Sequence, residues 1–345
     1  MFKDLRVKPS NLIENMPRIR LANLPTPIIE MPRLSRELGG PRIYVKRDDL
    51  TSLVFGGNKA RKLEFLIADA MNQGCDTVIT AGRSQSNHAC MTAAAALQSG
   101  IHPVLLLFDD HPAMDVGNLL IDRLLGAECR FFLESEYGNV QMMIEKVADE
   151  LRSEGKNPYL IPIGGASPIG CLGYILGARE IKEQLNTMGI SLDAIIHASS
   201  TGGTLAGLEI GKRLSQLDAP IITMSVYRSA EELAKRVVHE AEETIDFLNL
   251  KLSLRPSDLS IYDQYIGPGY GMVTQEVVET MQLFARTEGI LLDPVYSAKA
   301  AWGLVDLIAQ GIFKSNQTVL FIHTGGIPGL FAKSPELVQI MTRHK

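Results

Sequence analysis

The sequence lacks several features that would assign it to common protein classes. It has only four cysteines and no C-x-x-C pair, a pattern that fits a reducing compartment and neither a disulfide framework nor a thiolate zinc site. No apolar run reaches the roughly 18 residues that a membrane helix needs, and the N-terminus has no apolar stretch typical of a secretory signal. We therefore expect a cytoplasmic protein without a metal site or a membrane partner.

Strong charge of one sign and nucleotide-binding fingerprints are also missing. The formal net charge is -5, which argues against nucleic acid as a partner. Neither G-x-x-x-x-G-K-[ST] nor G-x-G-x-x-G occurs, so a nicotinamide-dependent dehydrogenase is disfavoured. Apolar residues make up 46% and charged residues 21% of the chain, as in ordinary globular proteins. A length of 345 residues predicts two lobes.

Short β-branched runs alternate with longer amphipathic segments along most of the chain. Apolar strands that alternate with helices indicate an α/β fold with parallel sheets covered on both faces. Ligands of such sheets bind beyond the carboxyl ends of the strands. The expected strands are 76–82, 103–108, 129–133, 158–163, 193–198, 220–226 and 318–323. The expected helices are 87–98, 116–125, 140–153, 174–185, one from 205, 231–249, 273–286 and 298–310.

The first candidate loop is GGNKARKLEFL, from Gly56 to Leu66. Its two glycines allow a tight turn or a close approach to a ligand. Lys59 and Lys62 follow at the start of a predicted helix and share a face, because they are three residues apart. Like charge and the helix N-terminus both depress the pKa of a lysine, as a Schiff-base lysine requires. Two solvated lysines at an ordinary helix start are the alternative.

The second candidate loop, AGRSQSNHA, follows a strand and opens a helix. Ser84 to His88 are five consecutive polar side chains beside free helix N–H groups, which suits a substrate carboxylate. Simple N-capping by Ser86 or Asn87 is the alternative explanation.

The third candidate loop is ASSTGGTLAG, from Ala198 to Gly207. Glycines and hydroxyls at a helix N-terminus predict a phosphate site. DPVYSAKA and HTGG form a fourth region, where Tyr296 and Thr324 are candidates that core packing and helix capping also explain.

Taken together, these segments resemble the family of 1-aminocyclopropane-1-carboxylate deaminase and D-cysteine desulfhydrase. That family belongs to the tryptophan-synthase-β-like class (fold type II) of enzymes that use pyridoxal 5′-phosphate (PLP). The resemblance covers nearly the whole chain. Its motifs are RIRLANLPTPIIEMPRLSRELGG, IYVKRDDL, GGNKARKLEFL, QSNH, GNLLIDRLLGA, GGASPIGCLGY, TGGTLAG, ARTEGILLDPVY and LFIHTGG, in this order.

The resemblance implies a PLP enzyme in which Lys59 carries the cofactor as a Schiff base. It also implies a two-domain, three-layer fold with a large domain (1–61 plus 168–345), a small inserted domain (62–167) and assembly as a homodimer. The implied catalytic residues are Lys59, Lys62, Ser86, Tyr270 and Tyr296. The implied cofactor-binding residues are Asn58, Lys59, Asn87, Ser200, Thr201, Gly202, Gly203, Thr204 and Thr324. The implied substrate-binding residues are Ser86, Asn87, His88 and Tyr296.

Two positions indicate the branch of the family. The deaminase branch has a glutamate directly after the tyrosine of DPVY and a leucine at the threonine of HTGG, where this chain has Ser297 and Thr324. A carboxylate would keep the pyridine nitrogen protonated and strengthen the electron sink that ring opening demands, whereas a hydroxyl does not. The pair therefore favours β-elimination, with D-cysteine giving pyruvate, ammonium and hydrogen sulfide.

Departures from the family keep one alternative substrate open. Relatives commonly have a small or apolar residue at Arg83 and often Arg-Gln at Cys90 and Met91. Arg83 is the only unusual cation that the sequence places near the site. If it faces the substrate it favours L-cysteate and a sulfo-lyase, whereas a rim salt bridge is the simpler explanation. A PLP carrier would lose the substrate-side groups that are present here, and a β-replacement synthase would carry a different lysine motif.

Overall fold

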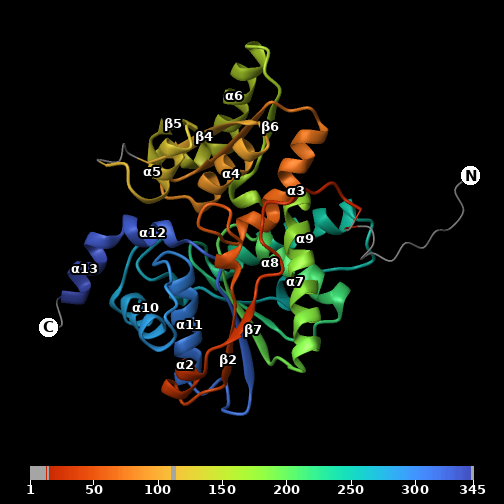
Figure 1. Cartoon of the computed structure of the whole chain (residues 1–345). Helices are drawn as coiled ribbons and strands as arrows, with labels where there is room; N and C mark the ends of the chain where they lie inside the picture. The colour runs from red at the N-terminus through yellow and green to blue at the C-terminus, as the bar shows by residue number, and fades with distance from the viewer. Residues whose placement is uncertain (1–12, 14, 110–113, 343–345) are drawn as a thin grey trace, which may run out of the picture.

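The computed structural model describes residues 13, 15–109 and 114–342, which form two α/β lobes (Figure 1). The larger lobe contains a six-stranded sheet with the order β1-β2-β10-β7-β8-β9. All neighbouring strands are parallel except β1 and β2, which pair antiparallel. The strands are β1 (Ile28–Glu30), β2 (Arg42–Lys46), β7 (Ala194–Ser199), β8 (Ile221–Ser225), β9 (Ser260–Tyr262) and β10 (Thr318–Ile322).

Helices cover both faces of this sheet because its buried strands are apolar on both sides (Figure 1). Alternate residues such as Ile195 and Leu320 pack toward one helical layer, and Ile196 and Val319 toward the other. The first layer contains α7 (Pro168–Met188), α8 (Gly203–Ser215) and α9 (Ala230–Phe247). The second contains α2 (Pro32–Glu37), α10 (Gln275–Glu288) and α11 (Ser297–Ala309). The expected three-layer arrangement is thus present.

The smaller lobe is built on a four-stranded parallel sheet with the order β5-β4-β3-β6. Leu106 packs toward α6 on one face, and Leu105 and Leu107 pack on the opposite face with Ala89 and Ala93 of α4. The strands are β3 (Thr77–Gly82), β4 (His102–Phe108), β5 (Glu128–Phe132) and β6 (Pro158–Leu160). The helices are α4 (Asn87–Gln98), α5 (Gly117–Leu124) and α6 (Val140–Ser153).

Helix α3 (Lys59–Asn72) connects the lobes and spans the domain boundary expected at 61/62. All strands of the smaller sheet lie inside the expected insertion of 62–167, whose exact bounds stay a prediction. The chain ends with α12 (Ile327–Ala332) and α13 (Ser334–Thr342). None of the helices in the described ranges is both long and apolar enough to cross a membrane.

Three details differ from the sequence expectation. Helix α7 starts six residues earlier than expected, because Ser167 caps it by accepting a hydrogen bond from the N–H of Gly170 and Pro168 suits the first helical position. Strand β6 ends at Leu160, before Pro162, which has no N–H for the sheet. The short strands β1, β2 and β9 were not predicted, and β1 adds an antiparallel edge to an otherwise parallel sheet.

Candidate active site

A cavity of about 500 Å³ lies between the lobes and is lined by all four loops that the sequence singled out. It opens at the carboxyl ends of β3 and β7, where ligands of parallel sheets bind. The predicted site residues that line it are Asn58, Lys59, Ser86, Asn87, His88, Ser200, Thr201, Gly202, Thr204, Tyr270, Tyr296 and Thr324. Lys62 and Gly203 are the two predicted residues that do not line it.

Lys59 is the first residue of α3, and two glycines fix its position. Gly56 and Gly57 both have positive φ (73° and 139°), and a Cβ on Gly57 would lie 2.9 Å from the carbonyl oxygen of Thr324. Burial, followed by the positive charge of Lys62, holds the pKa of Lys59 well below its usual range. This shift favours the uncharged amine, which is the form that acts as a nucleophile or base.

Lys62 lies behind the glycine-rich loop, outside the cavity. Its Nζ donates to the carbonyl oxygen of Gly164 at 3.1 Å, and a Cβ on Gly203 would lie 2.9 Å from it. Burial lowers the pKa of Lys62, although Cys171 and Glu240 partly offset this effect. This position does not support the expectation that Lys62 assists proton transfer at the substrate.

The loop from Ser200 to Thr204 forms the cradle expected for a phosphate. Gly202 has φ +97°, and Gly203 begins α8, so free helix N–H groups lie at this end of the cavity. A Cβ on Gly203 would lie 3.0 Å from Cα of Ala166, which leaves no room for a larger residue. Thr204 Oγ1 accepts a hydrogen bond of 3.1 Å from Nδ2 of Asn58. The residues present therefore fit a phosphate group.

A buried asparagine that the sequence did not single out orients Asn87. Asn118 donates through Nδ2 to Oδ1 of Asn87 at 2.8 Å and to the carbonyl oxygen of Gln85 at 3.0 Å. Because the amide oxygen of Asn87 is engaged, its N–H₂ group is left to donate toward the cavity. Ser86 caps α4 by accepting a hydrogen bond from the N–H of Ala89 at 3.2 Å, so the capping role considered above is present at a residue that also lines the site.

His88 is a neutral residue in this site. Thr80 Oγ1 donates to the carbonyl oxygen of Ile161 at 2.9 Å, so it must accept the hydrogen bond of 3.0 Å that it shares with Nε2 of His88. Burial, with the charges of Lys59 and Lys62, holds the pKa of His88 well below its usual range. His88 therefore offers no charge to the carboxylate that it was expected to bind.

Tyr270 and Tyr296 share a hydrogen bond between their hydroxyl groups inside the cavity. Burial raises the pKa of Tyr270 to about 12 and raises that of Tyr296 further, so both stay protonated at neutral pH. Lys299 holds the loop of Tyr270, because its Nζ donates to the carbonyl oxygens of Ile266 at 2.6 Å and Gly269 at 2.9 Å.

The two hydroxyl residues that indicated the family branch are placed differently. Thr324 lines the cavity, but Ser297 is fully buried and does not. Ser297 Oγ donates to Oδ1 of Asp293 at 2.6 Å, and that carboxylate also accepts the N–H groups of Val295, Tyr296 and Ser297 at the start of α11. The hydroxyl of Ser297 therefore completes a helix cap, and of the two positions only Thr324 lines the cavity.

Arg83 has the rim salt bridge that was the simpler explanation. It pairs with Glu134 at 2.6 Å and Asp109 at 3.5 Å, and its guanidinium lies 5.7 Å from the ring centroids of both Tyr137 and Tyr270. It also lines the cavity, but two carboxylates neutralise its charge.

Arg83 is not the only cation of the site. Arg228 and Arg236 also line the cavity, with Tyr137, Tyr227 and Glu240, and none of these was predicted. Tyr227 and Arg228 come shortly after the carboxyl end of β8, so the rule about strand ends would have found them.

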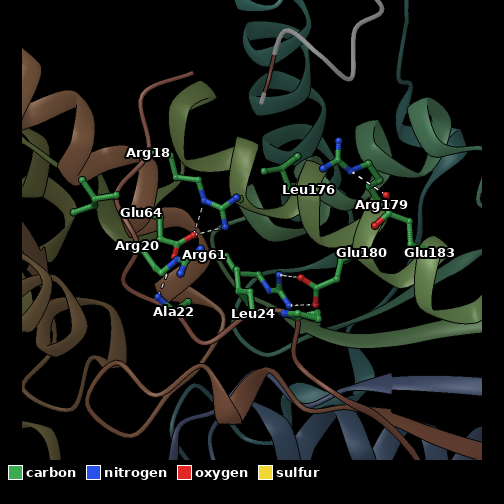
Figure 2. A pocket seen from close by; sticks show the side chains of 13 residues that line it. Arg18, Arg20, Ala22, Leu24, Arg61, Glu64, Leu176, Arg179, Glu180 and Glu183 are labelled. Atoms are coloured by element: carbon green, nitrogen blue, oxygen red, sulfur yellow. Dashed lines mark hydrogen bonds and ion pairs between the residues drawn. The ribbon is translucent and has the colours of Figure 1, made fainter. Parts of the chain in front are cut away.

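A second cavity, of about 520 Å³, lies on another side of α3 (Figure 2). Its charged side chains bind one another: Arg18 pairs with Glu64 at 2.5 Å, and Arg61 with Glu180 at 2.8 Å. The N–H groups of Leu21 and Ala22 donate to Glu64, which ties the N-terminal segment to α3. We infer that these ion pairs stabilise the fold.

Comparisons with known proteins agree with this geometry. The sequence pattern of the pyridoxal-phosphate dependent enzyme family matches residues 19–325. A Pyrococcus abyssi protein with the provisional name 1-aminocyclopropane-1-carboxylate deaminase is 42% identical over 97% of this chain and 99% of its own. A D-cysteine desulfhydrase of Klebsiella pneumoniae is 40% identical over 94% of this chain and 98% of its own.

Solved structures show the same fold. A crystal structure of a homologue of 1-aminocyclopropane-1-carboxylate (ACC) deaminase superposes with a TM-score of 0.89, at 39% identity, over 97% of this chain and 100% of its own. A threonine deaminase isoform of Solanum lycopersicum gives a TM-score of 0.69 at 17% identity, over 96% of this chain and 87% of its own.

Proposed function

The chain belongs to the family of pyridoxal-phosphate dependent enzymes, and on that premise we propose that it catalyses β-elimination on a small amino acid, with D-cysteine as substrate. The observation that best supports this proposal is the content of the cavity. It combines a buried lysine of lowered pKa, Lys59, with a neutral hydroxyl, Thr324, at one of the two positions that separate the branches of the family. The overall reaction would convert D-cysteine and water to pyruvate, ammonium and hydrogen sulfide.

The residues of the cavity divide into groups that hold the cofactor and groups that face the substrate. Bound PLP supplies an electron sink that stabilises negative charge at Cα of the amino acid. The Ser200–Thr204 loop would hold its phosphate, the amide N–H₂ of Asn87 its phenolic oxygen, and Thr324 its ring nitrogen. Lys59 would hold it covalently at rest.

The remaining side chains supply proton transfer and orientation. Lys59, once its amine is free, takes the α-proton of the substrate, which its lowered pKa permits at neutral pH. Ser86 and the N–H groups at the start of α4 orient the substrate carboxylate. The hydroxyl pair of Tyr270 and Tyr296, which stays protonated, hydrogen-bonds the departing sulfur and can give it a proton.

Opening of the cyclopropane ring is disfavoured by the same cavity. Among the described residues that line the cavity, Glu240 is the one carboxylate, and the charges of Lys62, behind the glycine-rich loop, and Arg236 both act on it. A hydroxyl at the ring nitrogen does not favour protonation of the pyridine, so the electron sink is weaker. A weaker sink suffices where a good leaving group, such as thiolate, departs.

L-Cysteate is the second candidate substrate, because its β-sulfonate is anionic and cations line the cavity. Arg83 was the residue that suggested L-cysteate from the sequence. Its pairing with Glu134 and Asp109 weakens that argument. Arg228 provides an independent reason to include L-cysteate in a substrate test.

A substrate panel with the purified protein tests the proposal. It contains D-cysteine, L-cysteine, β-chloro-D-alanine, D-serine, L-cysteate and 1-aminocyclopropane-1-carboxylate, with pyruvate, 2-oxobutyrate, sulfide and sulfite as readouts. We expect pyruvate and sulfide from D-cysteine and no 2-oxobutyrate. Efficient ring opening would refute the argument from Thr324, and sulfite from L-cysteate without activity on D-cysteine would transfer the function to a sulfo-lyase.

A further inference from the structure

Arg228 is a partly exposed cation of the cavity that lacks an acidic partner. Its Nη1 donates to the carbonyl oxygen of Ser200 at 2.9 Å, and its guanidinium lies 4.7 Å from the ring centroid of Tyr227. These contacts use one of the five N–H groups of the side chain. No carboxylate of the described residues lies within 4 Å of it.

The other arginines of the described chain that are buried or partly exposed differ from Arg228 in this respect. Each has a carboxylate oxygen within 3.5 Å of its guanidinium group, as buried charges require. These arginines are Arg47, Arg61, Arg83, Arg130, Arg179 and Arg213. Arg228 is thus the exception, and it lies in the candidate active site.

A second cation increases the unbalanced positive charge. Arg236 lines the same cavity and, within the described residues, also has no carboxylate within 4 Å. Burial and the charge of Arg236 lower the pKa of Arg228, although Tyr227, Tyr137 and Glu232 partly offset this effect. Arg236 is exposed to solvent, and the charge of Glu240, one turn further along α9, acts on it, so the guanidinium of Arg228 is the less compensated of the two.

Both arginines flank the glycine-rich loop. Arg228 is bonded to Ser200, the first residue of the loop. Arg236 precedes Val237 on α9, and a Cβ on Gly202 would lie 3.2 Å from Cγ2 of Val237, so α9 packs directly on the loop. The backbone of the loop offers N–H groups without a full charge, and the arginines add that charge beside it.

We propose that Arg228 and Arg236 form an oxyanion-binding position beside the Ser200–Thr204 loop, and that the phosphate of the cofactor is the anion bound there. The proposal deepens the proposed function, since it rests on the cofactor position given above, but it is independent of the choice of D-cysteine. An anionic β-substituent of a substrate has the same chemistry, and the contact with Ser200 favours the phosphate.

Binding of two forms of the cofactor tests the proposal. The full-length protein, freed of cofactor, is titrated with PLP and with pyridoxal, which has no phosphate, as wild type, Arg228→Met, Arg228→Lys and Arg236→Met. We expect Arg228→Met to weaken PLP binding about 10- to 100-fold, the loss of a charge-assisted hydrogen bond, and to leave pyridoxal binding unchanged. Arg228→Lys should retain most of the PLP affinity, and Arg236→Met should lose less than Arg228→Met.

Three controls keep the result interpretable. Arg286→Met removes an exposed cation of α10 and should change neither affinity. Equal weakening of PLP and pyridoxal by Arg228→Met would overturn the proposal, because it would assign Arg228 to support of Ser200. Unchanged PLP binding with a selective rise in KM for L-cysteate over D-cysteine would also overturn the phosphate assignment and move the anion to the substrate. If Arg228→Met weakens the binding of PLP but not of pyridoxal, and the wild type is inactive on D-cysteine, only the proposed substrate is refuted.

Discussion

Helix α3 contributes cationic side chains to two cavities. The two cavities differ in whether the cations that line them have carboxylate partners. Lys59 lines the cavity between the lobes, and neither it nor Lys62 behind it has a carboxylate within 4 Å among the described residues. Arg61 and Arg18 line the other cavity, and each is paired with a glutamate (Figure 2). The two cavities have similar volumes, about 500 and 520 Å³.

This difference distinguishes the side of α3 that faces the candidate active site from the side whose ion pairs stabilise the fold. On the paired side, burial would raise the pKa of Asp48, but the charge and hydrogen bonds of Arg61, with Lys46 and Tyr174, lower it to about 2. On the unpaired side, burial and like charge lower the pKa of Lys59, which favours its uncharged form and is typical of functional sites. The volumes of the two cavities and the number of charged residues that line them would not have distinguished the two cavities.

The largest effect is expected from Lys59→Ala. Loss of the base alone should reduce elimination about 10²- to 10⁴-fold, and loss of the covalent link adds to this. The fold should persist, because no ion pair of Lys59 is broken. Borohydride should attach PLP to Lys59 in the wild type and not in the variant, as read by peptide mass spectrometry. Attachment at Lys62 would contradict the assignment.

Arg61→Met tests the paired side of α3. It leaves Asp48 and Glu180 buried without their main partner, so we expect a loss of about 3–5 kcal/mol in the free energy of unfolding, measured with urea. The double variant Asp48→Asn/Arg61→Met is the control and should recover part of the loss. A loss below about 1 kcal/mol in Arg61→Met would mean that the pairing is not structural.

Within the described part of the chain, Asp122 is a buried carboxyl group without a cationic partner that lies outside the candidate active site. It lies on α5, away from both cavities, and among the described residues its carboxylate has no cation within 4 Å and only the thiol of Cys90 as a weak hydrogen-bond partner. Burial raises its pKa to about 7, although Cys90 and Arg123 partly oppose the shift. The group is therefore largely protonated in the folded state at acidic pH, where its neutral form is tolerated.

The sign of the pH dependence follows from this raised pKa. The stabilisation from protonated Asp122 is complete below the unfolded pKa of about 3.9 and is lost as the pH rises through the folded value of about 7. Relative to Asp122→Asn, the wild type should lose about 2–4 kcal/mol of unfolding free energy between these pH values. A constant difference between the two proteins across this range would refute the prediction.

The smallest effect is expected at the hydroxyl that faces the cofactor. Thr324→Ala removes one neutral hydrogen bond, about 0.5–1.5 kcal/mol, and should slow elimination about two- to twelve-fold while PLP stays bound. Ser297→Ala is the matched control, since its hydroxyl serves Asp293 and not the cavity. Ser297→Ala should lower the free energy of unfolding and leave kcat nearly unchanged. The reverse pattern would restore Ser297 as the group that determines the branch.

Much of the fold and part of the site could be predicted from local sequence. Helices 87–98 and 140–153 have the predicted bounds, because their apolar patterns are local, and Ser86 also caps the first of them. The short strands β1 and β9 were missed, since three residues carry no periodic signal. Asn118 was missed because its role depends on a partner far away in the sequence, Asn87, whereas Arg228 follows a predicted strand and could have been found from its position.

The sequence by itself determined the α/β class and indicated the glycine-rich loop, because strand periodicity and strand-end motifs are local properties of the chain, whereas the role of Lys59 was implied by the family resemblance. The tertiary structure decided which side chains share the cavity. It placed Lys62 behind the phosphate loop, turned Ser297 toward Asp293 and neutralised Arg83 with Glu134. Burial and pairing set the charge of each group, and both depend on residues that only folding brings together.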